Sequence, residues 1–266
     1  MFLARLLVLF SLVCISCAHS SFEQKQLKHA LDFATSNRLE LEILLQHYTY
    51  DSLKLEAAKF LIRNMPHCYS YQQGGEMDSV KRVRTYYSPF GQIDQTYARR
   101  WGHYTYRNLP KIYDAHIITA EYLIDNIDRA FDNWQKRPWN RSLSFEDFCE
   151  YLLPYRIGDE PLEEWRELYE KKYGYLLDSI YKGGDVVEAA NLVSRHLQEP
   201  VFIYCEDFEL PHIGPRYLFS HRYGSCVDAA DIVTYAFRAV GIPCMEDTDA
   251  RGGHVWNVVR DTTGRD

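Results

Sequence analysis

The sequence predicts an α+β protein, and three observations lead to this prediction. Apolar residues recur every three or four positions through much of the chain before residue 183, which is typical of amphipathic helices. Two β-prone runs, residues 241–247 and 255–259, follow one another near the end of the chain. A strongly patterned helix over residues 226–240 comes directly before them, so the chain closes with the order helix, strand, turn, strand.

The chain has 266 residues, enough for one large domain or two modest ones. A hydrophobic fraction of 46% with 25% charged residues is ordinary for a globular protein that buries a core. The formal net charge is -7, so composition argues against a protein built to bind nucleic acid.

Residues 1–18 are predicted to be an export signal. Arg5 precedes an apolar run over residues 6–17, which is too short to span a bilayer as an ordinary helix. Cleavage could follow Ala18, or Cys17 could be lipidated as in a bacterial lipoprotein, and an uncleaved membrane anchor is the third alternative. In each case the rest of the chain is expected to be exported, either to the bacterial cell envelope or into the medium.

Residues 22–183 are expected to form a mainly helical N-terminal region. The periodicity predicts helices over residues 22–35 and 115–134, and Asn37 and Asp51 are placed to cap two helices between them. Short connections indicate an antiparallel helical array.

Residues 184–266 are expected to form a catalytic core, after a change in composition at a pair of glycines. Before this boundary, Pro161 is placed to begin a helix that ends near Gly174. After it, Asp185 is placed to cap the first helix of the core.

An irregular stretch over residues 81–107 interleaves arginines with tyrosines and a tryptophan. Such a pattern can bind single-stranded nucleic acid, but an exported protein makes that partner improbable. A surface that binds a glycan or peptide, and a solvated face with ordinary aromatic packing, remain as alternatives.

The helix over residues 226–240 is well specified, and it begins with a cysteine. Ser225 is a good N-cap, Asp228 completes a variant of the capping box, and Gly241 suits the C-terminal cap. Cys226 therefore lies at the positive end of the helix dipole, which favours a reactive thiolate. An odd number of cysteines beyond the signal also indicates at least one unpaired thiol.

His254 is the predicted partner of Cys226, because it follows two glycines and opens a β-prone run. A thiolate and a histidine are the components of a nucleophile with its proton carrier. His212 and His221 are expected to be loop residues, and no ligand spacing supports a metal site.

Three runs together resemble the core of the transglutaminase-like superfamily: GSCVDAA at residues 224–230, RAVGIP at 238–243 and HVWN at 254–257. The resemblance begins near Tyr223, and residues 22–71 also look like the N-terminal part of Bacteroidetes-type transglutaminase-like lipoproteins. It implies a papain-related fold with a Cys-His-Asp triad, and no cofactor. The implied chemistry is acyl transfer, in which the thiolate attacks an amide carbonyl of a peptide or protein and water or an amine resolves the thioester.

The third residue of the triad, which the family carries on the strand after the histidine strand, has two candidates here. Asp266 is the last residue, and Asp261 is less favoured because residues 261–264 indicate a turn. We therefore expect the catalytic core to be incomplete at its C-terminus in this chain.

Three functions remain open on the sequence alone. The first is hydrolysis of peptide or protein amides, as in a peptidase or amidase. The second is cross-linking, in which an amine reaches the thioester. The third is a non-catalytic cell-surface module that binds glycan, cell-wall material or peptide. Replacing Cys226 would abolish either activity and leave the binding module unchanged.

Overall fold

The computed structural model describes residues 21–75, 77–78, 81, 106–199, 202–204 and 210–265. The predicted signal with Cys17, most of the aromatic and basic stretch, and Asp266 lie outside the described residues. Four described cysteines are free thiols: Cys68, Cys149, Cys226 and Cys244. Among the described helices, none combines the length and the apolar character needed to cross a membrane.

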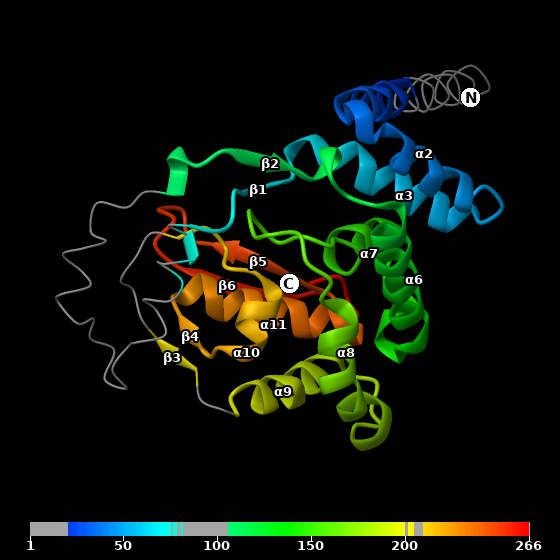
Figure 1. Cartoon of the computed structure of the whole chain (residues 1–266). Coiled ribbons are helices and arrows are strands. Elements are labelled where there is room, and N and C mark those ends of the chain that lie inside the picture. Colours follow the sequence, from blue (N-terminus) through cyan, green and yellow to red (C-terminus); the bar gives the residue numbers. More distant parts are fainter. Residues whose placement is uncertain are drawn as a thin grey trace, which may run out of the picture.

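The N-terminal part is helical, as predicted (Figure 1). Residues 21–33 are helical and are followed by α2 (Arg38–His47), α3 (Ser52–Asn64), α6 (Ala120–Lys136) and α7 (Phe145–Tyr151). Short 3₁₀ turns connect the elements of this half at Thr35–Asn37, Met65–His67, Tyr106–Asn108, Asp114–His116 and Pro138–Ser142. The first hydrophobic cluster lies between these helices, with Leu41, Leu44, Leu123 and Phe148 fully buried in it.

Two predicted caps in this part had different outcomes. Asp51 accepts a hydrogen bond from the backbone of Lys54 and caps α3, as predicted. Asn37 lies at the N-cap position of α2, but its side chain makes no capping bond. Its amide instead donates to the carbonyls of Ala115 and Ile118, so it joins α2 to the segment before α6.

The predicted helix between Pro161 and Gly174 is wrong at both ends. The segment around Pro161 is a loop, because the Glu160 carboxylate accepts hydrogen bonds from the backbone of Ile157 and Gly158 and holds the chain in a turn. The helix α8 begins later and runs over Arg166–Tyr175, and it continues past Gly174 into a π-helical turn at Leu176–Ile180.

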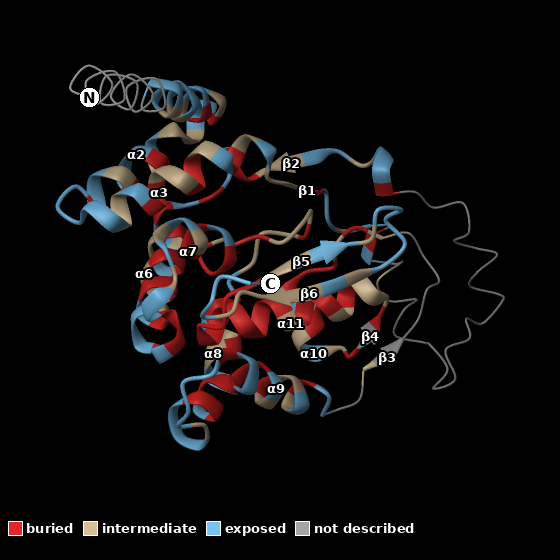
Figure 2. Cartoon of the chain, turned by 180° about the vertical axis from the view of Figure 1, so that it is seen from behind, coloured by how far each residue is buried: buried red, intermediate tan, exposed pale blue. Residues whose placement is uncertain are grey.

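The remaining elements surround one buried helix. They are α9 (Val186–Leu197), capped by Asp185 as predicted, and α10 (Pro215–Ser220). The helix α11 (Cys226–Val240) is followed by β5 (Cys244–Thr248) and β6 (Val255–Val259). Figure 2 shows α11 as largely buried, with the β5–β6 hairpin on one side and α8 and α9 on the other.

The described strands form three sheets of two strands each, which makes the α+β class correct in its coarse form. β1 (Tyr69–Tyr71) pairs antiparallel with β2 (Lys111–Tyr113), and β3 (Ile203–Tyr204) pairs parallel with β4 (Tyr223–Gly224). β5 pairs antiparallel with β6, from Cys244 opposite Val259 to Thr248 opposite Val255. The turn of this hairpin therefore lies toward the beginning of α11.

The second hydrophobic cluster extends across the predicted boundary at residues 183–184. It joins α11 and α9 to Trp139, to Trp165 and to Tyr169 of α8, all of which precede that boundary. The helix that carries Cys226 is thus packed against residues from both predicted parts of the chain.

Candidate active site

Cys226 is the first residue of α11, as predicted, and its side chain is half-buried. The capping box is formed: the backbone N–H of Ser225 donates to Asp228 Oδ2 over 2.7 Å. Gly224 has a φ of 159°, and a Cβ there would lie 2.4 Å from the same carboxylate oxygen. A glycine is needed at this point because the chain must pass closely over the Asp228 side chain before the helix begins.

His254 lies immediately before β6, and its side chain is exposed. Its ring centroid is 6.0 Å from that of Trp256, which is also exposed. Side chains alternate along a strand, so Asn257 lies on the opposite face, where its amide donates to the Ala230 carbonyl and to Thr234 of α11. No hydrogen bond joins the described side chains of Cys226 and His254.

The beginning of α11 and the turn of the hairpin nevertheless border one cleft. Two adjoining hollows share Ile157, His212 and Val227. The larger, of about 750 Å³, also reaches Gly252, and the smaller, of about 360 Å³, reaches Val255. The residue next to Cys226 and the residue next to His254 therefore line the same cleft.

Asp261 lies at the other end of β6 from His254. Its carboxylate accepts hydrogen bonds from the backbone of Thr263 and Arg265, and these bonds form the turn predicted for residues 261–264. A strand of this length separates its two ends by roughly 15 Å, so this carboxylate does not reach the His254 ring. Asp266, the other candidate, lies outside the described residues.

A histidine that the sequence placed in a loop without a role carries the most distinctive geometry of the cleft. His212 Nδ1 lies 2.9 Å from both carboxylate oxygens of Asp231, which is fully buried on α11. Burial acts to lower the pKa of His212, but the charge and hydrogen bond of Asp231, with Glu160 and Asp159 nearby, outweigh it and raise that pKa to about 10. His212 is therefore an imidazolium at neutral pH.

Glu246 of β5 completes this cluster. Its Oε1 accepts a hydrogen bond from Thr234 over 3.0 Å. Burial, followed by the negative charge of Asp231, raises the pKa of Glu246 to about 9, so it keeps its proton at neutral pH. Burial raises the pKa of Asp231 as well, and the charge of His212 acts against this rise.

One feature of the sequence could have revealed the pair. Asp231 stands in the apolar pattern of α11, between Ala230 and Ile232, and a buried carboxylate is rarely tolerated without a partner. His212 is 19 residues earlier in a loop, so only the fold brings the two together.

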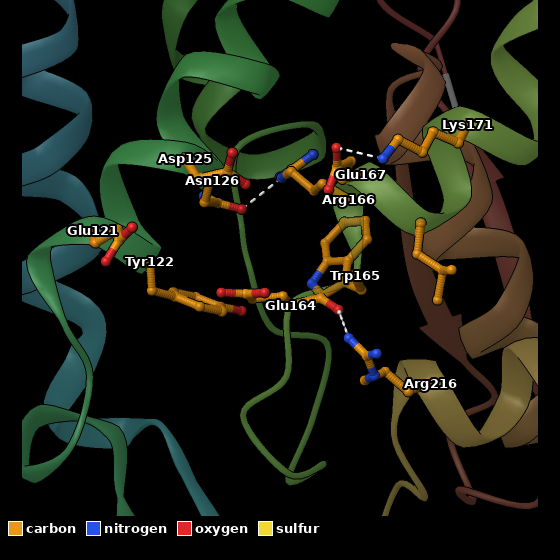
Figure 3. Close-up of a pocket in the computed structure, with 11 residues that line it drawn as sticks. Glu121, Tyr122, Asp125, Asn126, Glu164, Trp165, Arg166, Glu167, Lys171 and Arg216 are labelled. Carbon is orange, nitrogen blue, oxygen red and sulfur yellow. Dashed lines mark hydrogen bonds and ion pairs between the residues drawn. The ribbon is translucent and has the colours of Figure 1, made fainter.

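A separate pocket of about 310 Å³ lies between α6 and α8 (Figure 3). Several of its charged side chains are already engaged: Arg166 donates to Asn126, Glu167 pairs with Lys171, and Arg216 donates to the backbone carbonyl of Glu164. None of the predicted catalytic residues lines it. Among the described residues, no group of three or more histidine, cysteine or acidic side chains is placed to hold a metal ion.

Comparison with protein families, curated proteins and solved structures found no family model, no curated protein and no solved structure that matches the chain.

Proposed function

We propose that this protein catalyses thiol-dependent acyl transfer on peptide or protein amides, with hydrolysis as the net reaction. Cys226 is the nucleophile and His254 the general acid and base. The thiolate attacks the amide carbonyl, the imidazolium protonates the leaving amine, and water then cleaves the thioester. The backbone N–H of Cys226 is the first candidate for stabilising the oxyanion.

One observation carries the proposal: a half-buried cysteine opens a buried helix that is capped at both ends, beside a cleft. The packed helix fixes the position of the Cys226 backbone, and its first-turn N–H groups point toward the thiol and toward an attacked carbonyl. The cleft next to Val227 is large enough for several residues of an extended peptide.

His254 must turn toward Cys226 for the pair to act. Within the described residues its exposed ring makes no hydrogen bond that would oppose this rotation, and its neighbour Val255 lines the cleft. Contacts between catalytic groups often tighten only when substrate is bound.

The first test measures the rate of Cys226 alkylation against pH, resolved by mass spectrometry. Ordinary thiols react slowly below about pH 8.5, so rapid alkylation near pH 6 that slows at least tenfold in His254→Ala is the expected result. Cys68 is an internal control, since burial and the charge of Asp114 raise its pKa to about 11. A Cys226 profile that follows ordinary thiols and ignores His254 would contradict the proposal.

Cross-linking is the alternative within the same chemistry, and a labelled primary amine distinguishes it from hydrolysis. Incorporation of the amine into an acceptor peptide would mean transfer, whereas release of free acid alone would mean hydrolysis. A non-catalytic module that binds glycan or peptide is the alternative of another class, and it predicts that Cys226→Ala changes nothing.

We also propose that the protein is exported to a bacterial cell envelope, with Cys17 as its lipid anchor. Cell fractionation tests this: Cys17→Ser is expected to move the protein from the membrane fraction to the soluble exported fraction. Unchanged fractionation would count against the anchor.

A further inference from the structure

The His212 side chain is held by neighbouring groups but remains partly exposed. The Asp231 carboxylate binds Nδ1 of the ring. The backbone N–H of His212 donates to Asp159 Oδ1 over 2.9 Å. One face of the ring lies against Gly158, where a Cβ would come within 2.3 Å of both Cδ2 and Nε2. Nε2 has no hydrogen-bond partner in the described part of the chain, and the side chain keeps 24% of its surface exposed.

His212 lines both hollows of the cleft, so a ligand in the cleft can approach the exposed part of its ring. The larger hollow has an aromatic and apolar wall of Tyr69, Tyr106, Leu210 and Pro211. Such a wall with a few fixed polar groups is typical of a small-ligand or peptide site.

Most charged side chains around the larger hollow are already engaged. Arg156 is neutralised by the buried carboxylates of Asp114 and Glu160. Asp159 faces His212 and accepts its backbone N–H. Arg107 lies on the same wall, and its guanidinium is 5.4 Å from the centre of the Tyr106 ring.

We infer that this cleft binds the carboxylate of a peptide through the Nε2–H of His212, with Asp231 as the positioning residue that holds the ring through Nδ1. A charged donor to a carboxylate is about twice as strong as a neutral one, so the site discriminates between a carboxylate and its amide. The peptide as ligand rests on the proposed function, but carboxylate recognition does not require chemistry at Cys226.

The test therefore uses the full chain with Cys226→Ala, in which no acyl transfer can occur. Benzoate and benzamide are titrated by calorimetry, because they differ only in the carboxylate and suit the aromatic wall. Benzoate is expected to bind at least tenfold more tightly than benzamide. His212→Gln should remove this preference, while the control His196→Gln, a histidine on α9 outside the cleft, should retain it.

The pH dependence of benzoate affinity shows whether binding depends on the charge of His212 or only on the packing of its ring. The groups that face His212 are Asp231 of α11, Glu246 of β5, and Asp159 and Glu160 of the neighbouring loop. Benzoate affinity should be nearly constant from pH 6 to 9 when Asp231 is present. In Asp231→Asn the imidazole should titrate near its ordinary value of about 6.5, so affinity should fall at least tenfold over that range.

Each of these measurements has a result that would overturn the inference. Equal affinity for benzoate and benzamide, no saturable binding of either, or a preference that survives His212→Gln would overturn the inference. If benzoate is preferred, acetylated tripeptides with a free C-terminus or with an internal glutamate show which carboxylate the site takes. If Cys226 reacts like an ordinary thiol in the alkylation test while benzoate still binds, the proposed acyl transfer is refuted and the carboxylate site is not.

Discussion

A carboxylate that is fully buried needs a partner of opposite charge, and Asp231 finds it in His212. Burial, together with repulsion from the same carboxylate, raises the pKa of Glu246, which accordingly keeps its proton. At the scale of single residues, these three groups set how the folded chain responds to alkali.

Stability is expected to fall as pH rises from about 6 to 9. Glu246 has a pKa of about 9 in the folded chain against 4.5 ordinarily, so above pH 4.5 ionisation favours the unfolded chain. His212 titrates near 10 against 6.5, so its contribution is complete below pH 6.5 and is lost through pH 10.

Thermal unfolding checks this dependence. The loss in Tm between pH 6 and 9 should be smaller in Glu246→Gln by about 4 °C or more, since each kcal/mol corresponds to about 2–4 °C in a chain of this size. Glu150→Gln, an exposed glutamate of the same hollow, is the control and should keep the original slope. Equal slopes in all three proteins would contradict the assignment.

The candidate nucleophile could be predicted because its signals are local. Ser225, Cys226 and Asp228 stand within one turn, and the chemistry of a helix N-terminus depends on little else. The His212–Asp231 pair could not be predicted in the same way, because it depends on where a loop packs against α11. The direction of the His254 ring also depends on side-chain packing at the hairpin, which periodicity does not encode.

At the scale of elements, α11 is capped at its C-terminus as well as at its N-terminus. Gly241 adopts the left-handed conformation, with a φ of 82°, and its carbonyl accepts hydrogen bonds from Trp139 and Asn140. A Cβ at this glycine would lie 2.8 Å from the Asn133 carbonyl oxygen. The end of α11 is thus docked against α6 and the turn that follows it.

Gly241→Ala is expected to cost about 2–4 kcal/mol in the free energy of unfolding, from backbone strain and the displacement of these hydrogen bonds. Gly252→Ala is the matched control, because its φ is also positive, at 68°, but its Cβ would meet nothing within 4 Å. It should cost only about 1 kcal/mol of strain. Urea unfolding measures both, and equal losses would mean that the docking contributes little.

One helix was predicted with the wrong bounds. A proline and a glycine suggested a helix between residues 161 and 174, but the Glu160 carboxylate binds the backbone of Ile157 and Gly158 and holds the chain before Pro161 in a turn, which helical periodicity does not encode. Asp51 and Asp185 were predicted correctly because each caps the helix that directly follows it.

At the scale of the molecule, a buried arginine joins the two hydrophobic clusters. Arg166 of α8 donates to Asn126 of α6, to the carbonyls of Leu152 and Leu153, and to the carbonyl of Arg238 of α11. Its guanidinium therefore satisfies polar groups from both clusters at once, without a carboxylate bonded to it.

The described part of the chain is therefore expected to unfold in one transition. Far-ultraviolet circular dichroism and tryptophan fluorescence should give coincident urea curves. Arg166→Met should lower the free energy of unfolding by about 3 kcal/mol or more, since several carbonyls lose their donor. Lys171→Met, which removes only an exposed ion pair, should cost less than about 1 kcal/mol. Curves that separate in the unchanged protein would contradict this coupling.

The β5–β6 hairpin has a consequence for amide hydrogen exchange. Within the described residues each of its strands pairs only with the other, so alternate N–H groups point away from the shared ladder. Deuterium should therefore enter at every second residue of both strands while the amides between them stay protected. Binding of an extended chain along either edge would be visible as slower exchange at that edge alone.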